Sequence, residues 1–103
     1  MNLDLFDYSG TALGSISVTS ENENEAVCGD FLPTPAFSVY VTLFKEFEEA
    51  VNDQLFTHVD NLDKEIESFG FYVVDPSNGM KKKIFDLQII IGAGVSFRWA
   101  ESS

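Results

Sequence analysis

The only histidine of the chain, His58, lies in the acidic stretch HVDNLDKE (58–65), and it is the first residue to test for chemistry. Histidine is a common zinc ligand and the one side chain that ordinarily changes charge near neutral pH. On a helix, a second ligand would have to lie three or four residues further on. Asn61 and Leu62 occupy those positions, and Leu62 belongs to an apolar stripe. The stretch therefore predicts no metal site, and we expect His58 to be partly exposed near the start of a helix.

Nucleophilic catalysis is not indicated by the sequence either. Cys28 is the only cysteine and lies near acidic residues, which disfavour the thiolate of a nucleophile, so we interpret it as a structural thiol. Neighbouring carboxylates such as Glu46, Glu48 and Glu49 are typical of a solvated helix face. The GAG segment at 92–94 precedes a strand pattern, whereas a phosphate-binding loop precedes a helix. The sequence therefore predicts no catalytic, cofactor-binding or metal-binding residue.

The net charge of −11 is the property that restricts partners most. Residues 1–79 contain fifteen acids and two lysines, whereas residues 80–103 contain four basic and two acidic residues. Phosphate backbones and anionic membranes attract Lys and Arg, so we expect no direct nucleic-acid binding and no membrane association. An acidic surface favours a basic protein partner instead. The acids that we expect to contact this partner are Glu46, Glu49, Asp53, Asp63 and Glu67.

Strand patterns occupy both ends of the chain and would have to position any site. The predicted strands are 2–8, 12–18, 26–31, 71–75, 83–91 and 95–99. They alternate apolar and polar residues or lie between Gly, Pro and Asn-rich turns, as half-buried strands do. In the last two, the side chains expected on a buried face are Phe85, Leu87, Ile89, Ile91, Val95, Phe97 and Trp99.

Helical spacing occupies the middle of the chain. Thr34 is suited to cap a first helix, because Pro35 then takes the first helical position, where its missing N–H does no harm. The apolar stripe of this helix is Phe37, Tyr40, Val41, Phe44, Phe47 and Val51. The polar NDQ segment at 52–54 favours a break and a second helix over one long bent helix.

The second helix is predicted to begin near His58 and to stop at Gly70. Thr57 and Asp60 resemble a capping box, with Asp in place of the usual Glu. Gly70 is suited to the left-handed conformation that often follows a helix. The apolar stripe between them is Val59, Leu62, Ile66 and Phe69.

Strands grouped at both ends of a helical middle indicate the α+β class with an antiparallel sheet. The helical stripes need cover, so we predict a sheet of five or six strands with two helices packed on one face. The length of 103 residues and the 45% hydrophobic content suit one domain, 1–103. The start of the chain lacks the features of a signal peptide, and the longest apolar run is far below the ~20 residues of a membrane helix. We therefore expect a cytoplasmic protein.

Four functions are compatible with these features. The first is a small acidic protein-binding module of the inhibitor, immunity or adaptor type, and the second is a DNA mimic, although the acids are dispersed. The third is a small-molecule-binding or enzymatic domain with a pocket between helices and sheet. Its candidate polar groups are Tyr8, Tyr40, His58, Tyr72 and Asp86. The fourth is a homo-oligomer. The charge and the lack of a catalytic constellation favour the binding module over an enzyme.

Overall fold

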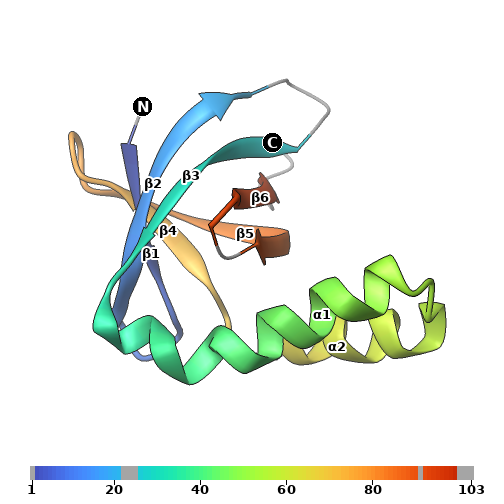
Figure 1. Ribbon diagram of the computed structural model, residues 1–103. Helices are drawn as coiled ribbons and strands as arrows, with labels where there is room; N and C mark the ends of the chain where they lie inside the picture. Colours follow the sequence, from blue (N-terminus) through green and yellow to red (C-terminus); the bar gives the residue numbers. More distant parts are fainter. Residues whose placement is uncertain (1, 22–25, 91, 100–103) are drawn as a thin grey trace.

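The computed structural model describes residues 2–21, 26–90 and 92–99, and in these residues six strands and two α-helices follow in the predicted order (Figure 1). The strands are β1 (Asn2–Phe6), β2 (Ala12–Ser20), β3 (Val27–Pro33), β4 (Tyr72–Asp75), β5 (Met80–Ile90) and β6 (Gly94–Trp99). The helices are the 3-10 helix η1 (Pro35–Tyr40), α1 (Val41–Asn52) and α2 (Phe56–Ser68). The predicted α+β class and the division of the helical middle into two α-helices are confirmed.

The sheet is a closed barrel and not the open sheet that the sequence predicts. The strand order is β1-β2-β3-β6-β5-β4, with antiparallel pairing throughout. Two pairings between distant segments close it: residues 4–6 pair with 72–74, and residues 27–29 pair with 95–97. Alternation along a strand shows which side is buried but not which distant strand lies beside it. The local alternation of apolar and polar residues therefore does not predict that the sheet closes into a barrel.

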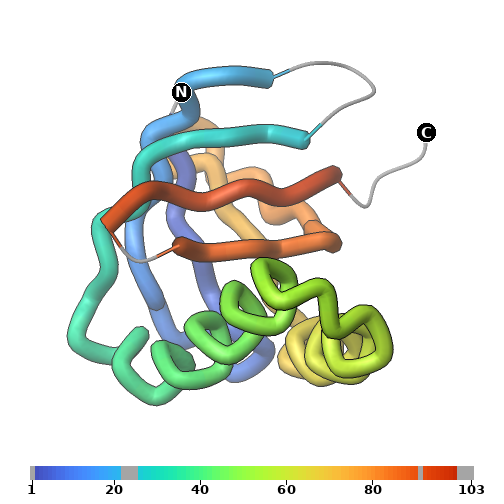
Figure 2. Tube along the Cα trace, turned by 45° about the vertical axis from the view of Figure 1, so that its right-hand side comes forward, coloured from blue at the N-terminus to red at the C-terminus, as the bar shows by residue number. Residues whose placement is uncertain are grey.

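The helices lie across one end of the barrel, so the prediction that they pack on one face of a sheet is wrong (Figures 1 and 2). The barrel fills its own interior with side chains that are at most 4% exposed, among them Leu5, Ile16 and Phe97. What needs cover is its open end, where η1 contacts β2 and both α-helices contact β5. No helix in the described ranges combines the length and apolar character that crossing a membrane requires.

The helices turn one shared apolar side toward the barrel. Its buried members are Phe37, Tyr40, Leu43, Phe44, Phe47, Ala50, Leu62 and Ile66. Val41 and Val51 were predicted on this stripe, but Val41 is half-buried and Val51 is 39% exposed. The 3-10 winding of η1 shifts the phase of the stripe, so extrapolation at 3.6 residues per turn fails. The last turn of α1 also extends beyond the strands, so Val51 has less barrel to pack against (Figure 1).

The connection between α1 and α2 is tighter than the sequence predicts. Gln54 has a left-handed φ of 57°, and the N–H of Leu55 donates to the carbonyl of Ala50 at 3.0 Å. These features define a Schellman-type helix end. Because the chain reverses so quickly, α2 begins at Phe56 with Leu55 in the N-cap position.

Of the two signals predicted for the ends of α2, the one at the start is wrong and the one at the stop is confirmed. The capping box at Thr57 and Asp60 is not formed, because both residues already lie inside the helix. The stop at Gly70 is confirmed: its φ is 60°, and its N–H donates to the carbonyl of Glu67 at 3.1 Å. Gly70 therefore follows α2 in the same left-handed conformation that Gln54 adopts after α1.

A bulge in β5 changes which side chains face inward. The pairing with β6 shifts by one residue between Phe85 and Gln88, and Asp86 has a left-handed φ of 53°. Phe85, predicted to be buried, is instead 38% exposed, while Ile84 packs against the core. An inserted residue reverses the alternation, so the prediction fails on one side of the bulge.

Beyond the bulge the predicted alternation is largely confirmed. The buried side chains there are Leu87, Ile89, Val95 and Phe97. Trp99 is half-buried at the end of β6, where its Nε1 donates to Oε2 of Glu21 at 3.0 Å. The predicted position of Ile91 lies outside the described residues.

Candidate functional site

The acids predicted to contact a partner divide into two groups. Glu46, Glu49 and Asp53 follow at helical spacing on the exposed side of α1. Asp63 and Glu67 lie on α2, close to Asp86 of β5. The structure therefore brings Asp63 and Glu67 together but separates them from the acids of α1.

His58 contacts the α1 group across the helical hairpin. Its Nε2 lies 3.5 Å from Oε1 of Glu46, and the two side chains are 45% and 51% exposed. The predicted partial exposure of His58 is confirmed. Helical spacing indicates only partners three or four residues away on the same helix, so the sequence does not reveal a partner on the neighbouring helix. An ion pair this exposed contributes little to stability.

Three carboxylates meet where α2 passes β5, and we call Asp63, Glu67 and Asp86 the acidic junction. One carboxylate oxygen of each residue lies within 4.8 Å of the others. Asp63 and Glu67 are four residues apart and therefore share a side of α2. Asp86 reaches them because the β5 bulge turns it outward. Nothing in the sequence around Asp86 predicts that it lies close to α2.

The acidic junction is electrostatically unfavourable. Burial raises the pKa of Asp63 above its ordinary value, and the charges of Glu67 and Asp86 raise it further. The guanidinium of Arg98 on β6 offsets part of this repulsion, since its Nε lies 3.4 Å from Oδ2 of Asp86. Both side chains of that pair are about half exposed, at 49% and 50%. Negative charge is therefore concentrated here at a cost to the folded state.

Carboxylate oxygens are the ligands that Ca²⁺ and Mg²⁺ prefer. The acidic junction could supply three of them, but such ions take six or more ligands, and Arg98 already lies beside Asp86. These carboxylates alone do not complete a metal site. We therefore assign no metal to them.

A cleft of 410 Å³ lies beside the acidic junction, between the end of α2 and strands β4 and β5. Its lining residues are Tyr8, Ile66, Glu67, Gly70, Phe71, Tyr72, Lys81, Lys83, Ile84, Phe85, Asp86 and Leu87. The lining combines an apolar floor with two lysines and two acids. Of the polar groups predicted for a pocket between helices and sheet, Tyr8, Tyr72 and Asp86 line this cleft.

The remaining two predicted pocket residues lie elsewhere. His58 lies in the helical hairpin, and Tyr40 is 7% exposed beneath the barrel. The hydroxyl of Tyr40 donates to Oδ2 of Asp7 at 2.8 Å. Burial raises the pKa of Tyr40 to about 12, and the hydrogen bond to Asp7 raises it as well. Tyr40 is therefore an uncharged structural donor.

Asp7 is a buried carboxylate with a full set of donors. It is 6% exposed, and its Oδ1 accepts hydrogen bonds from Ser9 N–H at 3.0 Å, Ser9 Oγ at 2.7 Å and Thr11 N–H at 3.1 Å. Burial alone would raise the pKa of Asp7, but hydrogen bonds from Ser9, Tyr40 and Thr11 hold it below its ordinary value. Asp7 therefore fixes the β1–β2 turn against Tyr40 of η1.

The end of the helical hairpin exposes apolar side chains, and we call Val51, Leu55 and Phe56 the hairpin tip. Leu55 is 52% exposed and Phe56 is 69% exposed, beside Val51 at 39%. The sequence places Leu55 and Phe56 either at the end of the first helix or at the start of a connection, and neither interpretation predicts their exposure. The signal in the sequence was the apolar pair Leu55 and Phe56 directly after the polar NDQ segment. A reversal of the chain at this point leaves these two side chains without a core to pack into.

Cys28 is exposed on β3, and its interpretation as a structural thiol stays a prediction. Its neighbours Val27 and Gly29 are the buried positions of this strand. Strand alternation therefore places Cys28 on the outer side of the barrel.

Comparisons of the chain with protein-family models, curated proteins and solved structures gave no match. Function is therefore argued from the charge, the exposed apolar side chains and the cleft.

Proposed function

We propose that the protein is a small acidic binding module that docks on a basic protein through its helical layer, residues 41–69. The observation that carries this proposal is the exposed hairpin tip inside a strongly acidic segment. Residues 41–69 contain eight acidic residues and two lysines, a net charge of −6, more than half of the −11 of the whole chain.

The combination of an apolar centre and a charged surround is typical of protein interfaces. Binding energy concentrates in a few apolar or aromatic side chains, while polar residues around them keep water away. Phe56, which is 69% exposed, is the candidate anchor, and Asp53 and Asp60 are exposed residues close to it in sequence. The partner of this surface is a basic protein with an apolar pocket for Phe56.

The five acids predicted from the sequence would act mainly on encounter. Glu46, Glu49 and Asp53 extend along α1 from the hairpin tip, and Asp63 and Glu67 extend along α2. Exposed charges of this kind accelerate association with an oppositely charged surface and make it sensitive to salt. Acids on both helices would let the layer attract a partner from two sides of the tip.

Affinity capture from native cell extract tests the proposal. We expect the immobilised protein to retain a basic protein at low salt and to release it at high salt. Phe56→Ala should reduce capture of that protein by about tenfold or more, as loss of an anchor residue does. Val39→Ala is the matched control, because Val39 is 76% exposed on η1, away from the hairpin tip. Equal capture by the Phe56 and Val39 variants would contradict the proposal.

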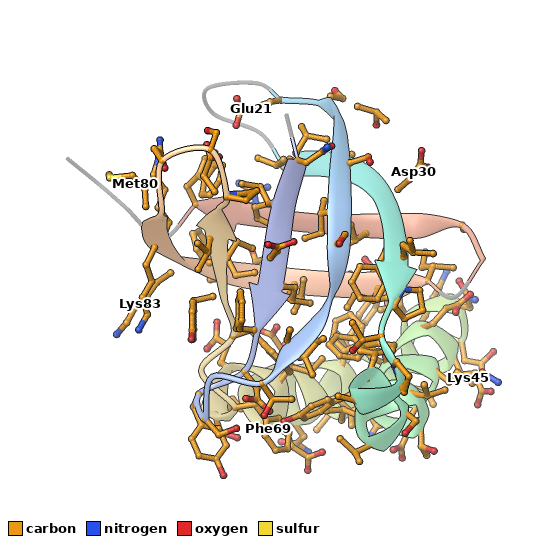
Figure 3. All side chains as sticks on the ribbon, turned by 90° about the vertical axis from the view of Figure 1, so that its left-hand side faces the viewer. Glu21, Asp30, Lys45, Phe69, Met80 and Lys83 are labelled. Atoms are coloured by element: carbon orange, nitrogen blue, oxygen red, sulfur yellow. The ribbon has the colours of Figure 1, made fainter. Side chains whose placement is uncertain are left out.

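A second pair of variants tests the charge of the helical layer. Asp53→Asn removes one charge beside the hairpin tip, and Asp30→Asn removes one from β3, where Asp30 projects from the barrel wall away from the helices (Figure 3). Asp53→Asn should slow association several-fold at low salt, whereas Asp30→Asn should change it by less than about twofold. The same loss for both variants would mean that only net charge matters and that the helical layer is not the docking surface.

A further inference from the structure

The cleft beside the acidic junction has the dimensions of a small-molecule site. Its volume of 410 Å³ falls within the range of about 300–1,000 Å³ that is usual for such sites. It lies on the barrel side of α2, at the opposite end of this helix from the hairpin tip. Its walls come from elements far apart in sequence, and the β5 bulge forms one of them.

The interior of the cleft is suited to an apolar or aromatic body. Its floor includes Ile66, Phe71 and Leu87, which are all at most 6% exposed. The rings of Tyr8 and Phe85 stand at the cleft and are 73% and 38% exposed. A ligand that covered these rings would remove exposed apolar surface from water.

The lysine side of the cleft is suited to an anion. Lys81 and Lys83 line it, in a chain that has six lysines and arginines and a net charge of −11. The Nζ of Lys81 lies 4.4 Å from the ring centroid of Tyr72, and Lys83 extends outward from β5 (Figure 3). Within the described part of the chain, neither ammonium has a carboxylate within ion-pair distance.

The other side of the cleft repels anions. Glu67 and Asp86 line it there, and burial together with their negative charges raises the pKa of Asp63 next to them. A ligand with one carboxylate would therefore bind in one orientation, with that group toward the lysines. A molecule with anionic groups at both ends would place one of them beside the acids.

We propose that this cleft binds a small apolar monocarboxylate, with its ring or branched chain on the floor and its carboxylate beside Lys81 and Lys83. This inference is independent of docking through the hairpin tip, which shares no residue with the cleft; of the helical layer, only Ile66 and Glu67 line the cleft. Variants of the cleft should leave capture of the basic partner unchanged, and Phe56→Ala should leave binding in the cleft unchanged.

Amide NMR titration of the intact protein with three probes tests the proposal. The probes are 3-phenylpropionate, 3-phenylpropylamine and 3-phenylpropanol, which share a ring and differ in charge. We expect 3-phenylpropionate to shift amides within 66–72 and 81–87 and to bind roughly fivefold more tightly than the amine. The alcohol should fall between them, and added salt should narrow the differences. Binding of the amine as tightly as the carboxylate, or no shift with any probe, would overturn the proposal.

Neighbouring lysines provide a matched pair of variants. Lys83→Gln should weaken binding of 3-phenylpropionate roughly fivefold. Lys82→Gln removes the same charge from the next residue, but the Nζ of Lys82 lies 4.9 Å from the ring centroid of Trp99 and Lys82 does not line the cleft. Its effect should stay below about twofold. Equal effects of the two variants would show non-specific attraction and would overturn the proposal.

Asp86→Asn tests the orientation of the ligand. Asparagine tolerates the left-handed φ of 53° at this position, so the bulge is retained. Removing the negative charge should strengthen binding of 3-phenylpropionate and weaken binding of 3-phenylpropylamine. A change of the same sign for both probes would contradict an acidic side that orients the ligand.

Discussion

Asp7 and the acidic junction show two opposite treatments of carboxylates in one small domain. Asp7 is 6% exposed and accepts hydrogen bonds from two backbone N–H groups and two hydroxyls. Asp63 lies among other carboxylates, and its pKa is raised, whereas that of Asp7 is lowered. Burial disfavours the charge at both places, so the difference comes from the neighbours. The hydrogen-bond donors around Asp7 make its charge stabilise the fold, whereas the carboxylates around Asp63 make its charge unfavourable to the fold.

This difference separates a charge that stabilises the fold from charges that oppose its stability. Asp7 connects the β1–β2 turn to Tyr40 and so fixes the barrel to η1. The acidic junction costs stability, and a left-handed residue, Asp86, is needed to complete it. Features that oppose stability are retained most easily where a partner or ligand uses them. The predictions below test whether the two sites have the opposite effects on stability that this account requires.

The largest expected effect is that of Asp7→Ala. The variant leaves the donors on Ser9, Thr11 and Tyr40 without their acceptor, so we expect a loss of about 3 kcal/mol in the free energy of unfolding. Urea denaturation measures this loss. Asp30→Ala on the exposed side of β3 is the control and should stay within about 0.5 kcal/mol of the unmodified protein. A loss for Asp7→Ala no larger than that of the control would remove the distinction between the two sites.

Asp86→Gly should have the next largest effect, with the opposite sign. Glycine removes both one charge of the acidic junction and the side chain that disfavours a φ of 53°. We expect the free energy of unfolding to rise by about 1 kcal/mol. Asp86→Asn separates the causes, since it removes the charge and keeps a side chain at this φ. If Asp86→Gly destabilised the protein, the bulge would have to be held by contacts of the Asp86 side chain.

Asp63→Asn should raise stability by about 0.5 kcal/mol at neutral pH, because it removes like-charge repulsion from Glu67 and Asp86. Thermal denaturation at low salt measures the change, and added salt should reduce it. Asp4→Asn on β1 serves as a comparison, because Asp4 lies outside the acidic junction. A loss of stability for Asp63→Asn would mean that its carboxylate has favourable partners.

Acidification should affect the two sites at different pH. Because the pKa of Asp63 is raised in the folded state, protonation favours folding, and its unfavourable effect fades as pH falls through that raised value. Because the pKa of Asp7 is lowered, its stabilising effect is complete above the ordinary aspartate value and fades as pH falls from that value through the lowered one. Denaturation of both variants from pH 7 to pH 3 should therefore show that the gain from Asp63→Asn disappears before the loss from Asp7→Ala does. The reverse order would be incompatible with the account.

Local patterns predicted the elements of this fold well. Hydrophobic alternation identified the strand segments, and helical spacing together with the polar NDQ segment identified two helices. Gly70 was predicted to end α2 because glycine adopts the left-handed conformation easily. Each of these features depends on neighbours within a few residues, which a single sequence displays.

Apart from the local capping box at Thr57 and Asp60, the failures involve partners distant in sequence or a change of phase. Closure of the barrel depends on the pairing of β1 with β4 and of β3 with β6. The contact between His58 and Glu46 crosses from one helix to the next. Asp86 joins the acidic junction only because a bulge reverses the alternation of β5. No turn residue such as glycine indicates that bulge in the sequence. Acidity of the helical layer and three polar groups of the cleft, Tyr8, Tyr72 and Asp86, were predicted from the sequence, but the apolar hairpin tip was not.

Carboxyl ¹³C NMR titration tests the contrast between Asp7 and Asp63 most directly, because it follows each side chain separately. The account predicts that Asp63 titrates above the ordinary aspartate value of about 3.9 and Asp7 below it. It also predicts that Asp86→Asn lowers the pKa of Asp63 and leaves that of Asp7 unchanged. Titration of Asp63 at or below the pKa of Asp7 would contradict the central distinction between a satisfied and a crowded carboxylate.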